Sequence, residues 1–267
     1  MTGTKRGTRR QRGLIVTPRD VRTLEELAVM RVADREQMKI AAGFRSTTRV
    51  NARLLALTRA GLLRRFFLGS GGGRKALYAL SQKGAQLVQV PIRGPRRRQN
   101  EMLIADFFVQ HQLSVNQVYC ALKFGTIPNP GVKFVNWIAF HEPLVAGFSL
   151  IPDGYVEFAT PSGIDASFIE VDLGHEGLAV WKEKTRHYVQ FALSGANERQ
   201  FRQPRFRVLV LVNSERRLQS VRTAVAGITQ KIFWFATLDA VHGEKFFGSV
   251  WLRPVGDTHQ PFFTESR

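Results

Sequence analysis

The chain has 267 residues and a formal net charge of +18 at pH 7, from 39 Lys and Arg against 21 Asp and Glu. With 44% hydrophobic residues, it can bury the core of one large or two modest domains. One cysteine, Cys120, excludes an intrachain disulfide and favours a reducing cytoplasm. No apolar run approaches the ~20 residues of a membrane span, and the basic N-terminus lacks a signal peptide's apolar stretch.

The excess positive charge is confined to the first part of the chain. Residues 1–100 contain 23 Lys and Arg against 5 Asp and Glu, whereas residues 101–267 contain 16 of each. This composition is typical of a polyanion-binding domain joined to a neutral one. DNA and an anionic membrane surface both qualify, but the basic helices lack the Trp and Phe face that membrane insertion needs. Residues 1–16 form a basic disordered arm in this interpretation, which either adds phosphate contacts or only aids solubility.

Residues 17–95 predict a winged helix-turn-helix domain. Apolar residues recur at helical spacing in three consecutive segments, with Thr17 and Asp34 as N-caps. Two strand-like runs then flank the glycines from Gly69 to Gly73, which indicates a basic hairpin. Ser81 caps one more helix. The three helices are expected over residues 17–32, 34–44 and 46–61, and the two strands over residues 62–68 and 76–80.

The third helix of a winged helix-turn-helix domain enters the major groove of DNA. Arg and Asn side chains present paired donors to base edges, while residues at the hairpin tip contact phosphates. A charged helix face is often merely solvated, but the one-signed surplus of charge argues against that interpretation. The residues expected to contact DNA are Arg45, Arg49, Asn51, Arg53, Arg74 and Lys75.

Residues 96–267 read as an α/β domain with a central mixed sheet. Neither a Walker loop nor a GxGxxG turn occurs there. Residues 123–150 are interrupted by Pro and Gly, so their structure and role stay open. Strands are expected over residues 155–158, 166–172, 206–212, 232–238 and 248–253, and helices over residues 101–113, 177–192 and 214–227.

Three acids in this domain are placed to share one cation. Strand alternation puts Glu170 and Asp172 on one face, and Asp153 opens the adjacent strand. Clustered carboxylates repel one another unless a cation joins them, and hard oxygens suit Mg²⁺ or Mn²⁺. Such a metal can activate a water, and a nearby lysine can neutralise a phosphate. The alternative is that these acids pair with Lys182, Lys184 or Arg186 and pin the helix to the sheet.

The pattern "PD" at 152–153 followed by "FIEVD" at 168–172 resembles the PD-(D/E)xK nuclease superfamily. Asp172 stands where the lysine of that motif belongs. Some members carry the lysine on the following helix, which makes Lys184 the candidate and Lys182 the second choice. The whole layout over residues 17–240 is similar to the bacterial replication-relaxation family. This resemblance implies a DNA-binding protein of plasmid or mobile-element replication.

The predicted architecture is α+β, with a winged helix-turn-helix domain followed by a restriction-endonuclease-like domain. The predicted function is DNA binding, with metal-dependent nicking or cleavage if the site is active. The alternative is a non-catalytic replication accessory factor or transcriptional regulator with a degenerate nuclease-like domain. Expected partners are double-stranded DNA and other replication or mobilisation proteins, and a homodimer is compatible with the sequence. The expected catalytic residues are Asp153, Glu170, Asp172 and Lys184, with the three acids as ligands of Mg²⁺ or Mn²⁺.

Overall fold

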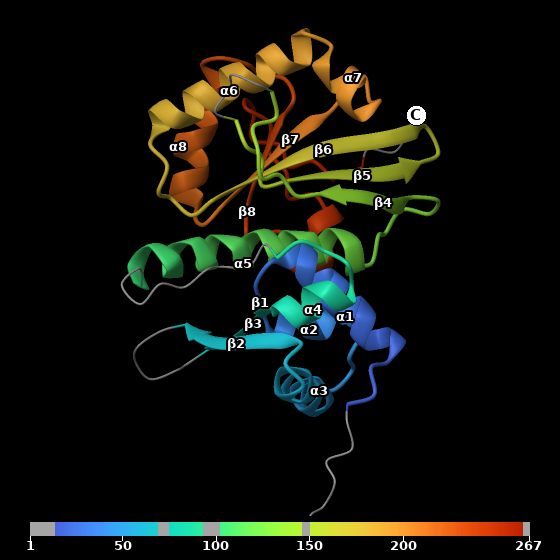
Figure 1. Cartoon of the computed structure of the whole chain (residues 1–267). Helices are drawn as coiled ribbons and strands as arrows, with labels where there is room; N and C mark the ends of the chain where they lie inside the picture. The colour runs from blue at the N-terminus through green and yellow to red at the C-terminus, as the bar shows by residue number, and fades with distance from the viewer. Residues whose placement is uncertain (1–13, 69–74, 93–101, 146–149, 264–267) are drawn as a thin grey trace, which may run out of the picture. The chain divides into compact units, whose positions relative to one another are not determined.

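The computed structural model describes residues 14–68, 75–92, 102–145 and 150–263. The chain divides into two compact units, residues 1–106 (unit 1) and 107–267 (unit 2). Each unit has its own sheet, of three strands in unit 1 and five in unit 2 (Figure 1). The molecule is therefore α+β, as the sequence predicts.

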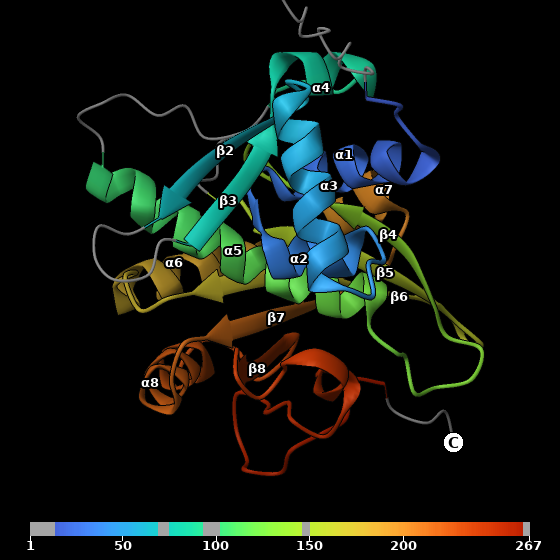
Figure 2. The same ribbon diagram turned by 90° about the horizontal axis from the view of Figure 1, so that it is seen from below.

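Unit 1 contains three helices, a β-hairpin and a further short helix in the described residues. The two strands of the hairpin, β2 and β3, pair antiparallel, from Leu63 opposite Leu80 to Leu68 opposite Lys75 (Figure 2). A two-residue strand, β1, adds to the other side of β3 and was not expected from the sequence. The elements are α1 (Pro18–Met30), β1 (Ala33–Asp34), α2 (Arg35–Ala41), α3 (Thr47–Arg59), β2 (Leu63–Leu68), β3 (Lys75–Leu80) and α4 (Gln82–Leu87).

The helices of unit 1 begin where side chains can satisfy the first free backbone N–H groups. The Thr17 hydroxyl accepts from the Asp20 amide at 3.3 Å, and the Asp20 carboxylate accepts in return from the Thr17 amide at 2.6 Å. Asp34 caps α2 in the same reciprocal manner, and Ser46 caps α3. The caps expected at Thr17 and Asp34 are confirmed, which fixes the start of each helix.

Unit 2 is built around a mixed sheet in the strand order β4-β5-β6-β7-β8. The pairs β4–β5 and β5–β6 are antiparallel, whereas β6–β7 and β7–β8 are parallel. The mixed sheet predicted for this part of the chain is therefore confirmed. The elements are α5 (Met102–Phe124), β4 (Lys133–Ile138), β5 (Gly154–Thr160), β6 (Gly163–Asp172), α6 (Leu178–Leu193), α7 (Ala196–Phe201), β7 (Arg207–Val212), α8 (Glu215–Ala226), β8 (Phe233–Thr237) and the 3₁₀ turn η1 (Gly243–Phe247).

Several parts of unit 2 differ from the sequence prediction: α5 runs to Phe124 although the helix was expected to end at residue 113, and α7 was not expected. The run 248–253 was expected to be a strand, but it forms only isolated bridges, Leu252 with Phe235 and Trp251 with Gln260. Its apolar residues instead enter an aromatic cluster. β4, in contrast, lies in the region that the sequence left open. Its side chains are half-buried at best and the strand is bulged between Phe134 and Asn136, so the sequence lacks the regular alternation by which a strand is recognised.

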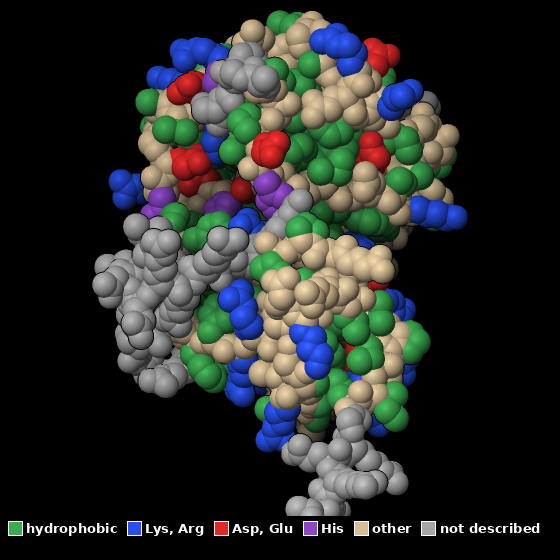
Figure 3. Space-filling model, in the orientation of Figure 1, with side chains coloured by type: hydrophobic (Ala, Val, Ile, Leu, Met, Phe, Trp, Pro, Cys, Tyr) green, Lys and Arg blue, Asp and Glu red, His purple; other side chains and the backbone are tan. Residues whose placement is uncertain are grey.

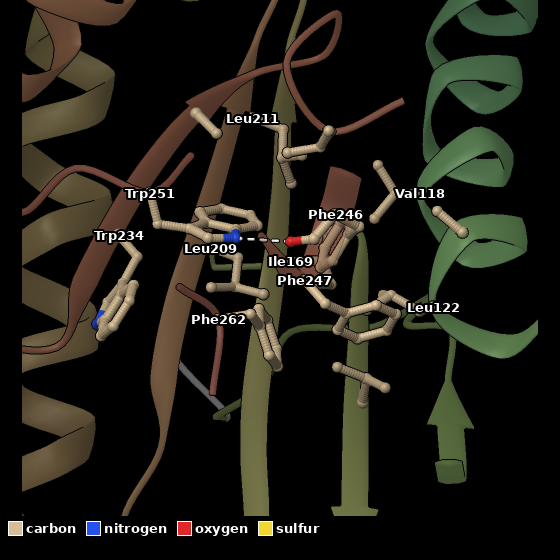
Figure 4. Packing of buried hydrophobic residues seen from close by; sticks show 14 of the residues in the cluster. Val118, Leu122, Ile169, Leu209, Leu211, Trp234, Phe246, Phe247, Trp251 and Phe262 are labelled. Carbon is tan, nitrogen blue, oxygen red and sulfur yellow. Dashed lines mark hydrogen bonds between the residues drawn. The ribbon is translucent and has the colours of Figure 1, made fainter. Parts of the chain in front are cut away.

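Helices cover both faces of this sheet, as Figure 1 shows. On one face, α6 and α8 pack through residues such as Tyr188 and Val221 against Phe168 of β6. On the other face, α5 and the chain after β8 bury Trp251 and several Phe rings (Figure 4). Burying one Phe side chain contributes roughly 2–3 kcal/mol, so these aromatic layers hold the sheet rigidly. Among the described residues, no helix is both long and apolar enough to cross a membrane.

Candidate functional site

Asp153 lies immediately before β5 and continues the pairing of β5 with β6. Its backbone N–H donates to the Ile169 carbonyl at 3.0 Å, and its Oδ2 accepts from the Val171 amide at 2.7 Å. The side chain thus takes the place of a further backbone partner at the end of the strand. Gly154 follows because a Cβ there would overlap the indole ring of Trp137. Local geometry therefore explains Asp153 and Gly154 of the "PDG" sequence.

Glu170 is the most deeply buried acid of unit 2, with 1% of its surface exposed. Its Oε2 accepts from Lys184 Nζ at 3.0 Å, and its Oε1 accepts from the Tyr188 hydroxyl at 2.7 Å. Lys184 and Tyr188 lie one turn apart on α6, so a single helix face supplies both donors. Lys184 also donates to Glu176 Oε1 at 2.8 Å. The structure thus brings together Glu170 and the lysine chosen from the sequence.

His111 of α5 joins these groups and was missed by the sequence reasoning. Its Nε2 lies 2.9 Å from the Val171 carbonyl, which requires the ring nitrogen to donate, and 3.4 Å from Asp153 Oδ2. His111 and Asp153 are far apart in sequence, and a single histidine in an amphipathic helix does not by itself indicate a functional site. Asp153, Glu170, Lys184, Tyr188 and His111 are called the acid–lysine cluster below.

The charges of the acid–lysine cluster depend on one another. Burial raises the pKa of Glu170 to about 7; Lys184 opposes this shift, and the negative charge of Asp153 adds to it. Burial alone would lower the pKa of His111, but its hydrogen bond to Asp153 and that residue's charge raise it to about 9. Burial likewise works against the charged form of Lys184, yet Glu170 and Glu176 raise its pKa. At neutral pH the cluster therefore contains two cations beside two acids.

Asp172 points to the same face of β6 as Glu170, as alternation predicts, but its contacts are separate. Its Oδ2 accepts from Trp181 Nε1 at 2.7 Å and from Arg217 Nε at 2.8 Å, and its Oδ1 accepts from the Gly174 amide at 2.6 Å. The carboxylate is only 2% exposed and is already neutralised. Asp172 therefore ties β6 to α6 and α8. The sequence offered the tie to α6 as an alternative but not these partners, because Arg217 lies far along the chain.

The three-carboxylate metal set expected from the sequence therefore needs correction. Among the described residues, no three Asp, Glu, His or Cys side chains are grouped so that they could hold a metal ion. Asp153 and Glu170 remain close enough for the charge of one to raise the pKa of the other. Mg²⁺ is commonly held by one or two carboxylates together with waters and substrate phosphates. Asp153 and Glu170 are thus the two acids that stay together, whereas Asp172 is held by Trp181 and Arg217.

The other lysine and arginine considered for this site play no part in it. The side chains of Lys182 and Arg186 are exposed on α6, and neither makes an ion pair within the described residues. The second-choice lysine is therefore excluded from the acid–lysine cluster. The alternative in which a lysine pins α6 to the sheet does occur through Lys184, and Trp181 and Tyr188 of α6 bind the same two acids of β6.

The predicted DNA-contacting residues of unit 1 fall into two groups. Arg49 and Asn51 are exposed on α3, and in the described part of the chain their side chains make no hydrogen bond or ion pair. Arg45 is exposed as well, but it precedes the N-cap Ser46 and therefore lies outside α3. Figure 3 shows Lys and Arg side chains spread over the visible face of unit 1.

The remaining members of that set are held by acids or lie outside the described residues. Arg53 donates through Nε to Asp20 Oδ1 at 2.6 Å and pairs with Oδ2 of the same buried carboxylate, which joins α3 to α1. Lys75 Nζ lies 2.5 Å from Asp34 Oδ2, although half of its side chain is exposed. Arg74 lies outside the described residues. Arg53 is thus a structural residue, unlike its neighbours on the helix.

A model of the replication-relaxation family matches residues 24–203, which is more than half of the chain. The chain belongs to the replication-relaxation family. The resemblance inferred from its motifs is confirmed, and the family makes this a replication-related protein. Searches of curated proteins and of solved structures each found no match. The match spans α3 of unit 1 and the acid–lysine cluster of this replication-relaxation protein.

Proposed function

We propose that this replication protein binds double-stranded DNA through unit 1, which acts as a winged helix-turn-helix domain with α3 in the major groove. The observation that carries the proposal is the division of α3 into two faces. Val50, Leu54 and Leu57 are fully buried, whereas Arg49 and Asn51 are exposed with donors available to bases or phosphates. The surplus of +18 in residues 1–100 supplies the attraction for a polyanion.

Duplex binding by the full chain tests this proposal. Arg49→Gln removes one exposed cation from α3, and Arg216→Gln removes one from the exposed face of α8 as a matched control. A gel-shift titration at low salt is expected to show a Kd about tenfold higher for Arg49→Gln, the typical loss for one base or phosphate contact. Wild-type affinity in Arg49→Gln, or equal losses in both variants, would contradict the assignment of α3.

A second function, cleavage of one DNA strand at the acid–lysine cluster, is favoured by the convergence of Glu170 and Lys184. Burying a carboxylate, an ammonium and a tyrosine hydroxyl together is costly, and groups with shifted pKa values concentrate at active sites. Asp153 and Glu170 would hold Mg²⁺ or Mn²⁺, which when bound polarises a phosphate and acidifies a water. Lys184, Tyr188 and His111 would supply the other roles in cleavage.

Lys184 is placed to neutralise a phosphate that reaches Glu170, because its ammonium lies 3.0 Å from that carboxylate. Tyr188 fixes the orientation of Glu170 by donating to Oε1. His111, which is protonated at neutral pH, adds a second cation beside Asp153. The rival function is a non-catalytic accessory factor in which the same Glu170–Lys184 pair only fastens α6 to the sheet.

Supercoiled plasmid incubated with Mg²⁺ or Mn²⁺ separates these two functions. Wild type is expected to give open-circular DNA, and Glu170→Gln and Lys184→Met are expected to give none. Glu183→Gln and Lys182→Met are the matched controls, because both side chains are exposed on the same helix. Open-circular product formed equally by all five proteins would come from a contaminant, and no product from wild type would favour the accessory factor.

A further inference from the structure

Unit 2 contains a cavity of about 1200 Å³ at the opposite end of the sheet from the acid–lysine cluster. It is bordered by the turn between β5 and β6, by the start of β7 and by Arg253. Arg253 follows Trp251 and Leu252, which form the isolated bridges to Gln260 and Phe235. Arg207 opens β7 and pairs with Ser167, whereas Glu170 of the acid–lysine cluster pairs with Val210. Three residues of strand span about 10 Å, and none of the residues that line the cavity belongs to the acid–lysine cluster.

Among the described residues, three arginines line this cavity and one acid, Asp165, accompanies them. Arg207 donates to Asp165 Oδ2 at 2.5 Å and to the Phe262 carbonyl at 2.6 Å, so its own charge is satisfied. Arg253 makes one long bond, 3.3 Å, to the Gln230 carbonyl. Arg205 is exposed and forms no hydrogen bond or ion pair within the described residues. The cavity therefore retains guanidinium groups whose donors are available.

The positive charges in the cavity are close together. The guanidinium carbons of Arg207 and Arg253 lie 4.9 and 5.0 Å from the centre of the same indole ring, that of Trp234. Burial and the neighbouring charge of Arg207 lower the pKa of Arg253. Like charges held near each other repel unless an anion joins them. An anionic ligand would relieve this repulsion.

Trp234 lines the cavity, and its indole also carries a buried donor. Its Nε1 is buried and makes no hydrogen bond in the part of the chain that the structure describes. Trp251, in contrast, donates from its Nε1 to the Phe246 carbonyl at 2.9 Å, and Figure 4 shows this bond beside the unbonded Trp234. A buried donor without a partner costs about 1–3 kcal/mol. Arg205 and Arg253 therefore give the cavity wall charge and hydrogen-bonding capacity that the described residues leave unused.

The cavity also has an apolar wall, made by Pro161, Ile164, Pro204, Ile232 and Phe263. Small-molecule sites are typically 300–1000 Å³, so the volume exceeds what inorganic phosphate needs. We propose that this cavity binds a nucleotide, with its phosphate on Arg205 and Arg253 and its base or sugar against the apolar wall. The nucleotide is either free or part of a single strand. This site is separate from the DNA-binding surface of unit 1 and does not depend on it.

Calorimetric titration of the full chain with dTMP, oligo(dT) and inorganic phosphate tests this inference. We expect dTMP to bind at least about tenfold more tightly than phosphate, because only the nucleotide also contacts the apolar wall. Tighter binding of oligo(dT) than of dTMP, lost in Arg253→Gln, would identify a strand as the source. Equal affinities for oligo(dT) and dTMP would identify a free nucleotide.

Arg205→Gln and Arg253→Gln should each weaken dTMP binding about tenfold, as expected for one charged hydrogen bond. Arg216→Gln, on the exposed face of α8, should leave it unchanged. Arg205 has no partner in the described residues, so its variant keeps the test valid even if Arg253→Gln unfolds. The inference is overturned if dTMP does not bind at millimolar concentration, if phosphate binds equally well, or if neither arginine variant weakens binding. Duplex gel shifts on the same proteins report on unit 1 independently.

Discussion

Two charged regions of the molecule differ in the exposure and pairing of their charges. They are the exposed face of α3 in unit 1 and the acid–lysine cluster in unit 2. On α3, Arg49 is exposed and has no ion-pair partner in the described residues. In unit 2, Glu170 and Lys184 are paired with each other and largely buried. An unpaired exposed charge contributes little to folding and is available to a ligand, whereas removing one partner of a buried pair leaves the other charge uncompensated and destabilises the fold. Substitutions in the two regions should therefore separate binding from stability in different ways.

The largest effect is expected where a buried carboxylate would lose its cation. Arg217→Met leaves Asp172 with only Trp181 and the Gly174 amide as donors. Breaking a buried ion pair from one side typically costs 3–5 kcal/mol, so we expect the free energy of unfolding to fall by about 3 kcal/mol. Urea denaturation followed by circular dichroism measures it. Arg216→Met, at an exposed neighbouring position, should change it by less than about 0.5 kcal/mol; equal effects would show that Asp172 does not need Arg217.

A comparison within α3 makes the contrast sharper. Arg53→Met removes the partner of Asp20, which is 1% exposed, and should lower the free energy of unfolding by about 2 kcal/mol. Arg49→Met should leave stability nearly unchanged and weaken duplex binding. Urea titration gives the free energy of unfolding of each variant, and gel shift gives the Kd of each variant for duplex DNA. If Arg49→Met were the more destabilising variant, the division of α3 into a structural and a binding arginine would be wrong.

The pH dependence of stability tests the charge state of His111. Its pKa is about 9 in the folded protein against 6.5 for the free side chain, so the folded state binds more protons between these values. The stability that it contributes is complete below pH 6.5 and is lost as pH rises through 9, by about 1–3 kcal/mol. Urea midpoints measured in EDTA from pH 6 to 9.5 should show this fall in wild type and a flatter profile in His111→Gln. If wild type and His111→Gln gave parallel profiles of stability against pH, the proposed His111–Asp153 interaction would be contradicted.

Local signals account for what the sequence predicted correctly. Thr17, Asp34 and Ser81 cap helices through neighbouring backbone groups, so a short window of sequence contains the whole interaction. The alternation of β6 likewise placed Glu170 and Asp172 on one face. Lys184 was selected through the resemblance to nucleases that carry the lysine on the following helix, and because it lies one turn before Tyr188 at the edge of the apolar stripe.

The failures involve partners that are distant in sequence. Arg217 reaches Asp172 across β7, and His111 reaches Asp153 from another helix, so no local pattern could indicate either contact. The apolar run 248–253 has strand composition, but aromatic packing around Trp251 leaves it with isolated bridges only. The sequence therefore located the acids. Only the tertiary contacts separated Glu170, which belongs to the acid–lysine cluster, from Asp172, which is held by Arg217.

The salt dependence of duplex binding by the full chain tests the central claim most directly, namely that exposed cations of unit 1 bind the DNA backbone. Fluorescence anisotropy with a labelled duplex over a range of salt concentrations gives log Kd against log salt. We expect affinity to fall steeply with salt, and the slope to decrease in magnitude by about 1 in Arg49→Gln if that residue neutralises one phosphate. Absence of duplex binding at low salt, or an affinity that does not respond to salt, would contradict the account.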